Sequence, residues 1–136
     1  GGLLTQGSAH VATRASSPDR VRNLRWLLPL LVAVGILVAT SWPRPPAMPN
    51  NSDKVVHLLA YAMLGASVAW AARTRLFGHA LLCFGAVSVF GAADEWHQQF
   101  IPSRRADVRD WLADTTGAAA GAFLVTALLR RREFTA

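Results

Sequence analysis

The stretch that decides the fold runs from Trp26 to Pro43 and reads WLLPLLVAVGILVATSWP, eighteen residues without a charged side chain. As an α-helix it would extend about 27 Å, close to the roughly 30 Å hydrocarbon core of a bilayer. Charge-free stretches of the same length follow at 55–72 and 76–93, and a fourth at 111–129 is interrupted only by Asp114. The pattern predicts four membrane-spanning helices.

The composition favours a membrane protein over a soluble helical one. Of the 136 residues, 52% are hydrophobic and 16% are charged, whereas soluble chains average about 25% charged residues. The net charge of +6 comes from arginines clustered between the apolar stretches, which is typical of proteins in anionic bilayers and argues against nucleic-acid binding. A signal peptide is disfavoured for the first stretch, which exceeds the roughly 7–15 residues of a signal core.

These stretches predict a single all-α membrane domain over residues 26–130, an integral membrane four-helix bundle. Its helices are expected at about 26–42, 55–72, 76–99 and 109–129. Pro102 disfavours helix at the residue before it and predicts a break between the last two helices. We expect a flexible basic cytoplasmic tail at 1–25 and a short cytoplasmic tail at 131–136.

The distribution of charge predicts the orientation. Nine of the 14 lysines and arginines lie on the side of the two termini: Arg14, Arg20, Arg22, Arg25, Arg73, Arg75, Arg130, Arg131 and Arg132. By the positive-inside rule, both termini are therefore expected in the cytoplasm. Six of the eight acids fall on the opposite, outer side: Asp53, Asp94, Glu95, Asp107, Asp110 and Asp114.

The first polar cluster opens the second predicted helix with Asp53, Lys54, His57 and Tyr61. Asp53, His57 and Tyr61 are spaced i, i+4, i+8 and therefore lie on one face. A carboxylate one turn before a histidine can fix its tautomer, which suits a general base or a metal-ligand relay. Alternatively, Asp53 only caps the helix and His57 is a hydrogen-bonded polar group between helices.

The second cluster, Asp94, Glu95 and Gln98, ends the third predicted helix. Two adjacent carboxylates are difficult to ionise together in a low-dielectric site, and one of them could serve as a proton donor or acceptor. The alternative is a polar helix end that lies among the lipid headgroups.

The third cluster precedes and opens the last predicted helix with Arg104, Asp110 and Asp114. Asp110 and Asp114 share a face with the ends of the sequence GAAAG at 117–121, a pattern that permits close helix packing. The face that packs tightly is thus expected to present both acids to the bundle interior, with Arg104 or Lys54 as counter-ion to Asp114. The alternative is a salt-bridge network that only joins helix ends.

The chain has no His-x-x-x-His pair, no second cysteine beside Cys83 and no glycine-rich phosphate loop. The sequence therefore predicts no metal site and no cofactor.

In order and spacing, the clusters resemble the VanZ-like membrane protein family, through DK-x-x-H-x-x-x-Y at 53–61, DE-x-x-Q-x-F-x-P-x-R at 94–104 and D-x-x-x-D-x-x-G-x-x-x-G at 110–121. The likeness covers 53–121, about half of the chain. There are two departures. Asp114 stands where asparagine is common in the family, and Ser103 stands where a glycine often precedes the arginine.

The resemblance implies a small multi-pass protein of the bacterial inner membrane. The family's named member is linked with low-level teicoplanin resistance, which points to the cell envelope. We expect an outer polar pocket that binds or modifies a lipid-linked or glycan-like substrate. The lipid bilayer is the other expected partner, and no nucleic-acid partner is expected. The candidate catalytic residues are Asp94, Glu95 and His57. The candidate binding residues are Asp53, Lys54, Tyr61, Gln98, Arg104, Asp110 and Asp114, among which Lys54 and Arg104 would hold an anionic headgroup.

Two other functions are weighed against this one. The chain could be a non-catalytic envelope protein whose polar network serves helix packing or a partner. Proton or ion movement is disfavoured, because the acids gather at one side with no relay to the other.

Overall fold

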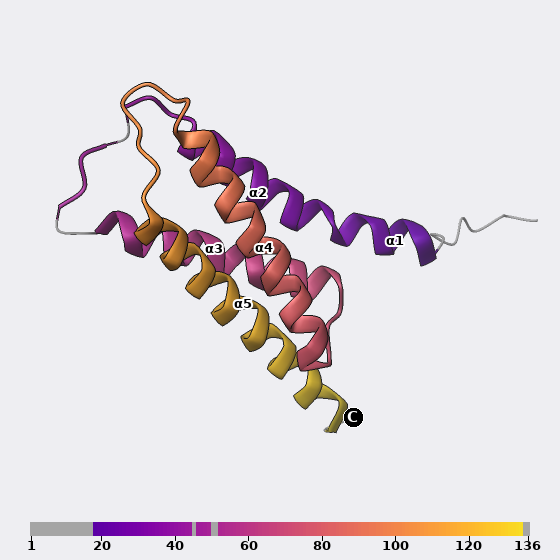
Figure 1. The fold of residues 1–136 in the computed structure, drawn as a ribbon. Helices are drawn as coiled ribbons and strands as arrows, with labels where there is room; N and C mark the ends of the chain where they lie inside the picture. Colours follow the sequence, from indigo (N-terminus) through magenta and orange to yellow (C-terminus); the bar gives the residue numbers. More distant parts are fainter. Residues whose placement is uncertain (1–17, 45, 50–51, 135–136) are drawn as a thin grey trace, which may run out of the picture.

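The structure, a computed structural model, describes residues 18–44, 46–49 and 52–134. These residues form only helices and connections, without a strand, and the all-α prediction is confirmed. The helices are α1 (Pro18–Arg25), α2 (Leu27–Thr40), α3 (Ser52–Ala71), α4 (Phe77–Gln98) and α5 (Val108–Phe134), shown in Figure 1. Of the predicted tails at 1–25 and 131–136, residues 1–17 and 135–136 lie outside the described residues, and the rest belongs to α1 and α5.

Four segments are long and apolar enough to cross a membrane, as the sequence predicts. They are Arg20–Thr40, Ser52–Ala71, Phe77–Gln98 and Val108–Arg132. Their outward faces are apolar, and Leu82 on α4 is 72% exposed. Such side chains are suited to lipid and not to water, so the chain is a multi-pass membrane protein.

The first span contains an interruption at Trp26, between α1 and α2. Pro29 has no N–H to donate to the carbonyl of Arg25, four residues before it, and proline disturbs a helix at that point. The structure thus adds α1 before the predicted start of the first helix at residue 26.

The connection from α4 to α5 spans 99–107 and contains the predicted break at Pro102 and Ser103. Ser103 has a φ of 68°, in the left-handed region that few residues other than glycine adopt. The next helix begins where Asp107 Oδ1 accepts the backbone N–H of Arg109 at 2.8 Å, as an N-cap residue does.

The closest helix packing is between α3 and α5, and it depends on glycine. A Cβ at Gly117 would collide with the carbonyl of Leu58, and a Cβ at Gly121 would collide with that of Ala62. The predicted close contact through GAAAG is confirmed, and the partner is α3.

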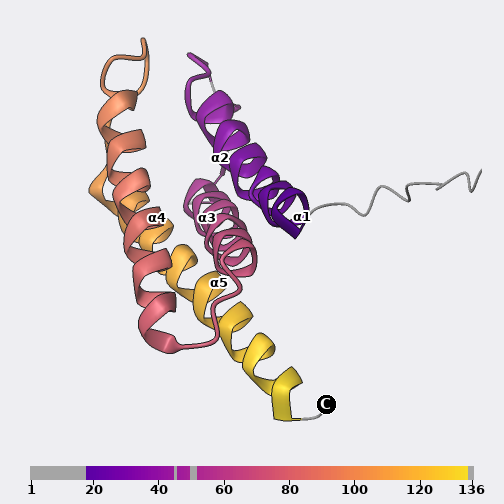
Figure 2. The ribbon, with the colours of Figure 1, turned by 90° about the vertical axis from the view of Figure 1, so that its right-hand side faces the viewer.

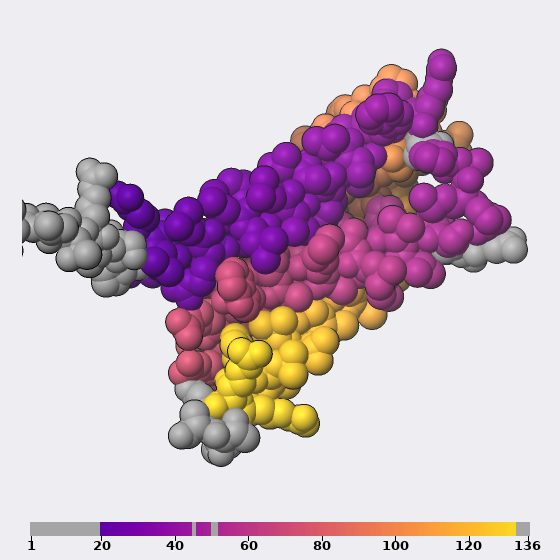
Figure 3. Space-filling model, turned by 180° about the vertical axis from the view of Figure 1, so that it is seen from behind, coloured from indigo at the N-terminus to yellow at the C-terminus, as the bar shows by residue number. Residues whose placement is uncertain are grey.

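The remaining helices pack around this pair. α4 packs against α5 and α3 (Figure 2), and α2 runs beside α3 on the face away from α5 (Figure 3). The C-terminal ends of α2 and α4 and the N-terminal ends of α3 and α5 lie at the same end of the molecule (Figure 1). This end, called the site end below, contains all three polar clusters of the sequence.

Candidate functional site

The innermost polar contact of the site end joins His57 on α3 to Asp114 on α5. His57 Nδ1 lies 2.9 Å from Asp114 Oδ1, and the Asp114 side chain is 0% exposed. The close packing of the two helices at Gly117, one turn after Asp114, holds this pair together. A charge this deep is costly without a partner, so the imidazole is the group that makes burial of Asp114 tolerable.

Lys54 lies nearer to the surface and contacts three carboxylates. Its Nζ is 2.5 Å from Asp110 Oδ1, 3.4 Å from Asp107 Oδ2 and 3.5 Å from Asp53 Oδ2. The Arg109 backbone N–H, and after it Lys54, lower the pKa of the Asp107 carboxyl below its ordinary value. Lys54 therefore joins the start of α3 to the start of α5.

Asp94 on α4 connects three helices. Its Oδ1 accepts the hydroxyl of Thr40 on α2 at 2.8 Å, and its Oδ2 accepts the hydroxyl of Tyr61 on α3 at 3.2 Å. The side chain is 1% exposed. With a donor on each oxygen, this carboxylate is fixed in one orientation.

Glu95, the next residue, points to the beginning of α5. Its Oε1 accepts from Gln98 Nε2 at 3.2 Å, and its Oε2 accepts the backbone N–H of Asp107 at 3.0 Å. Glu95 is 6% exposed and Gln98 is 2% exposed. The carboxylate thus helps to hold the 99–107 connection against α4.

Arg104 donates hydrogen bonds to backbone carbonyls at the C-terminal end of α2. Its Nε donates to the carbonyl of Trp42 and its Nη2 to that of Ala39, both at 3.2 Å. Carbonyls at a helix C-terminus have no intrahelical partner and carry partial negative charge, which explains the position of the guanidinium. Arg104 was predicted as one of two counter-ions to Asp114, but His57 is the partner that the structure places there.

The structure brings together the candidates from all three sequence clusters at the site end. Asp53 was predicted to orient His57 from one turn before it, whereas Asp114 makes that contact. Thr40 was missed as a partner of Asp94. The only signal for it in the sequence is a hydroxyl near the end of an apolar stretch, and such a hydroxyl commonly bonds only its own helix.

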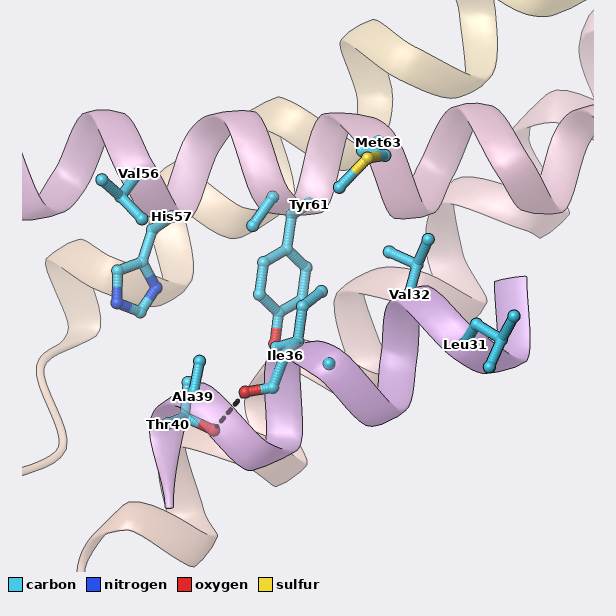
Figure 4. A pocket seen from close by; sticks show the side chains of 11 residues that line it. Leu31, Val32, Ile36, Ala39, Thr40, Val56, His57, Tyr61 and Met63 are labelled. Atoms are coloured by element: carbon cyan, nitrogen blue, oxygen red, sulfur yellow. Dashed lines mark hydrogen bonds between the residues drawn. The ribbon is translucent and has the colours of Figure 1, made fainter. Parts of the chain in front are cut away.

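Two cavities adjoin these residues. The first, about 430 Å³, lies between α2 and α3 and is lined mainly by apolar side chains, with His57 and Tyr61 on the α3 side (Figure 4). The second, about 470 Å³, is more polar than the first and is lined by Asp53, Asp110 and Arg104 among others. It is called the polar cavity below. Both cavities share the lining residues Ala39, Thr40, Val56 and His57.

A further grouping crosses three helices. One ligand-capable atom each of His57, Glu95 and Asp114 lies within 4.8 Å of the others. The sequence predicted no metal site because these residues are far apart in the chain and have no local ligand spacing.

The fold and the site define a small multi-pass helical membrane protein with buried carboxylates at one end of its helices. The family model described as VanZ/LLP1 matches residues 3–130, and the chain belongs to that family. The resemblance noted from the three clusters is thereby confirmed. No curated protein and no solved structure matches the chain.

Proposed function

We propose that this VanZ-family protein binds, and acts on, a lipid-linked envelope substrate with a glycan-like or anionic headgroup, at the outer face of a bacterial inner membrane. The observation that carries the proposal is the pair of adjoining cavities, one apolar and one polar, with His57 lining both. An amphipathic lipid has an apolar chain that would fit the first cavity and a polar headgroup that would fit the second.

The apolar cavity suits a hydrocarbon chain. It lies between α2 and α3, where Leu31, Ile36 and Met63 line it. Leu31 and Met63 are also exposed on the surface, which in a bilayer is the side from which a lipid tail would enter.

The polar cavity suits the headgroup, and Arg104 is its best anion ligand. Two N–H groups of Arg104 contact carbonyls, and a guanidinium has five. Lys54, which the sequence assigned the same role, is already surrounded by three carboxylates. Asp53 and Asp110 line the cavity and can accept hydrogen bonds from sugar hydroxyls.

Any proton transfer would use His57 and Glu95. His57 is the titratable side chain that lines both cavities. Asp94 accepts a hydroxyl on each oxygen, so its part in this proposal is to position Tyr61 and Thr40. The family's link with teicoplanin resistance makes the teicoplanin susceptibility of cells a phenotype to examine for this function.

A pair of glycine variants tests the proposal. Gly35 lines the apolar cavity, and a Cβ added there meets nothing within 4 Å. Gly35→Leu should therefore fill the cavity without disturbing the helices. Gly85→Leu on α4 is the matched control, because Gly85 also has open space at its Cβ and lies outside both cavities.

The measurement is mass spectrometry of lipids that co-purify with each variant in detergent. We expect one lipid class to be enriched in the wild type and in Gly35→Leu to fall by more than about tenfold, which corresponds to about 1.4 kcal/mol of lost binding. Gly85→Leu should retain it. Equal lipid in both variants at equal thermal stability would contradict the proposal.

The alternative, a polar network that serves packing alone, is favoured by one observation: Asp94 joins α2, α3 and α4. It predicts that Gly35→Leu behaves as the wild type in lipid content and in cells. It also predicts that Asp94→Asn acts only by lowering thermal stability.

A further inference from the structure

We propose that His57, Glu95 and Asp114 form a binding site for a divalent transition-metal cation. The three residues come from α3, α4 and α5, and their ligand-capable atoms lie within 4.8 Å of one another. One imidazole nitrogen and two carboxylate oxygens suit Zn²⁺ or Mn²⁺ better than Mg²⁺, which prefers oxygen and its own waters.

The strongest support is the free oxygen of Asp114. Its side chain is fully buried, and among the described residues Oδ2 has no hydrogen-bond partner. A buried carboxylate oxygen without a partner is costly. A cation beside it would remove that cost.

The free oxygen faces the helix that supplies the third ligand. A Cβ added at Gly91 on α4 would lie 3.5 Å from Asp114 Oδ2 and 3.1 Å from Cε1 of Tyr61, so this oxygen lies against the α4 backbone beside the Tyr61 ring. Glu95 follows Gly91 by four residues, about one turn of the same helix.

In the described part of the chain, the buried carboxylates of the site end have no lysine or arginine beside them. Asp94, Glu95 and Asp114 are all buried, while Lys54 contacts other carboxylates and Arg104 contacts backbone carbonyls. Among the described residues, His57 is the side chain that pairs with the buried Asp114 carboxylate. A divalent ion would supply the missing positive charge.

The ligand atoms need small movements to reach the spacing of a metal site. Metal–ligand bonds of about 2.0–2.2 Å place tetrahedral ligand atoms roughly 3.4 Å apart. His57 Nδ1 and Asp114 Oδ1 are 2.9 Å apart and would separate by about 0.5 Å. The Glu95 oxygen, which lies within 4.8 Å of the other ligand atoms, would approach by at most about 1.4 Å. Among the residues that the structure describes, the Gln98 amide and the backbone N–H of Asp107 hold Glu95.

Three protein ligands leave a coordination position open. Because His57 lines both cavities, an anionic headgroup could reach that position; this one consequence rests on the proposed function. Metal binding itself does not require a lipid, and with a metal bound His57 and Glu95 would serve as its ligands in place of proton transfer.

The test uses the full-length protein in lipid-free detergent, stripped by a chelator and dialysed against Zn²⁺, Mn²⁺ or Mg²⁺ separately. We expect about one Zn²⁺ or Mn²⁺ to be retained per chain, as the three-residue site predicts, and Mg²⁺ to be lost. Glu95→Gln and Asp114→Asn should weaken binding by more than about tenfold. Asp107→Asn, which alters a partly exposed carboxylate outside the trio and keeps an N-cap residue, should bind as the wild type does.

Failure of the wild type to retain either metal would overturn the site, as would unchanged affinity in Glu95→Gln and Asp114→Asn. Where these variants do not fold, electron paramagnetic resonance of Mn²⁺ on the wild type decides. Coupling to one imidazole nitrogen is expected, and a spectrum with oxygen ligands alone would contradict the site. Lipid content is measured separately, so the two proposals can fail independently.

Discussion

His57 illustrates how the environment of a residue decides its partner. Asp53 lies one turn before His57 on α3, and Asp114 lies on the neighbouring helix α5. The Asp53 side chain is 50% exposed and that of Asp114 is 0% exposed. Water satisfies the first carboxylate at little cost. The second is not exposed to solvent, and the hydrogen bond from the imidazole therefore contributes more to stability there.

This pair gives a prediction for thermal unfolding in detergent. His57→Ala should lower the free energy of unfolding by about 3 kcal/mol, because it leaves the Asp114 carboxylate buried without its partner. Adding Asp114→Asn to His57→Ala should restore most of that loss, because the unpaired charge is removed. Additive losses in the double variant would show that the pair is not coupled.

For single residues, the sequence predicted the turn at Ser103 and the gathering of the acids at one end, but not which side chain each acid contacts. The family pattern often has glycine at this position, and the φ of 68° explains why. The presence of the acids at one end was also predictable from charge counts. Their pairing was not, because it depends on the rotation of each helix about its own axis, which apolar stretches specify weakly.

At the scale of helices, the spans were predictable because hydropathy is local and each span is continuous. The α3–α5 contact was predictable in part. GAAAG at 117–121 indicated that the last helix packs closely against another, but it did not indicate which helix. Leu58 and Ala62, whose carbonyls contact these glycines, carry no distinguishing signal of their own.

The α3–α5 contact gives a second prediction. Gly121→Ala places a methyl group against the carbonyl of Ala62, and separation of the helices should lower the unfolding free energy by about 1–3 kcal/mol or more. Gly85→Ala, with nothing within 4 Å of the new Cβ, should be neutral or stabilise by up to about 1 kcal/mol. Equal melting temperatures for the two variants would contradict the packing.

At the scale of the whole molecule, alternate helix directions bring four helix ends to the site end. Arg104 contributes there by contacting the carbonyls that end α2, so the 99–107 connection and α2 depend on one another. The sequence assigned Arg104 to a headgroup or to Asp114, since helix-terminal carbonyls are not visible in a pattern of side chains.

The orientation in the membrane gives the last prediction, and it can be measured with single cysteines. Cys83 is buried and can be replaced by alanine. In that background, Ala106→Cys lies in the exposed connection of the site end, and Ala72→Cys lies exposed after α3 at the other end. The arginine distribution predicts that a membrane-impermeant maleimide labels Ala106→Cys on intact cells, and Ala72→Cys only after the cells are opened. The reverse pattern would place the carboxylates and both cavities in the cytoplasmic leaflet, where a substrate exposed only on the outer surface could not reach them.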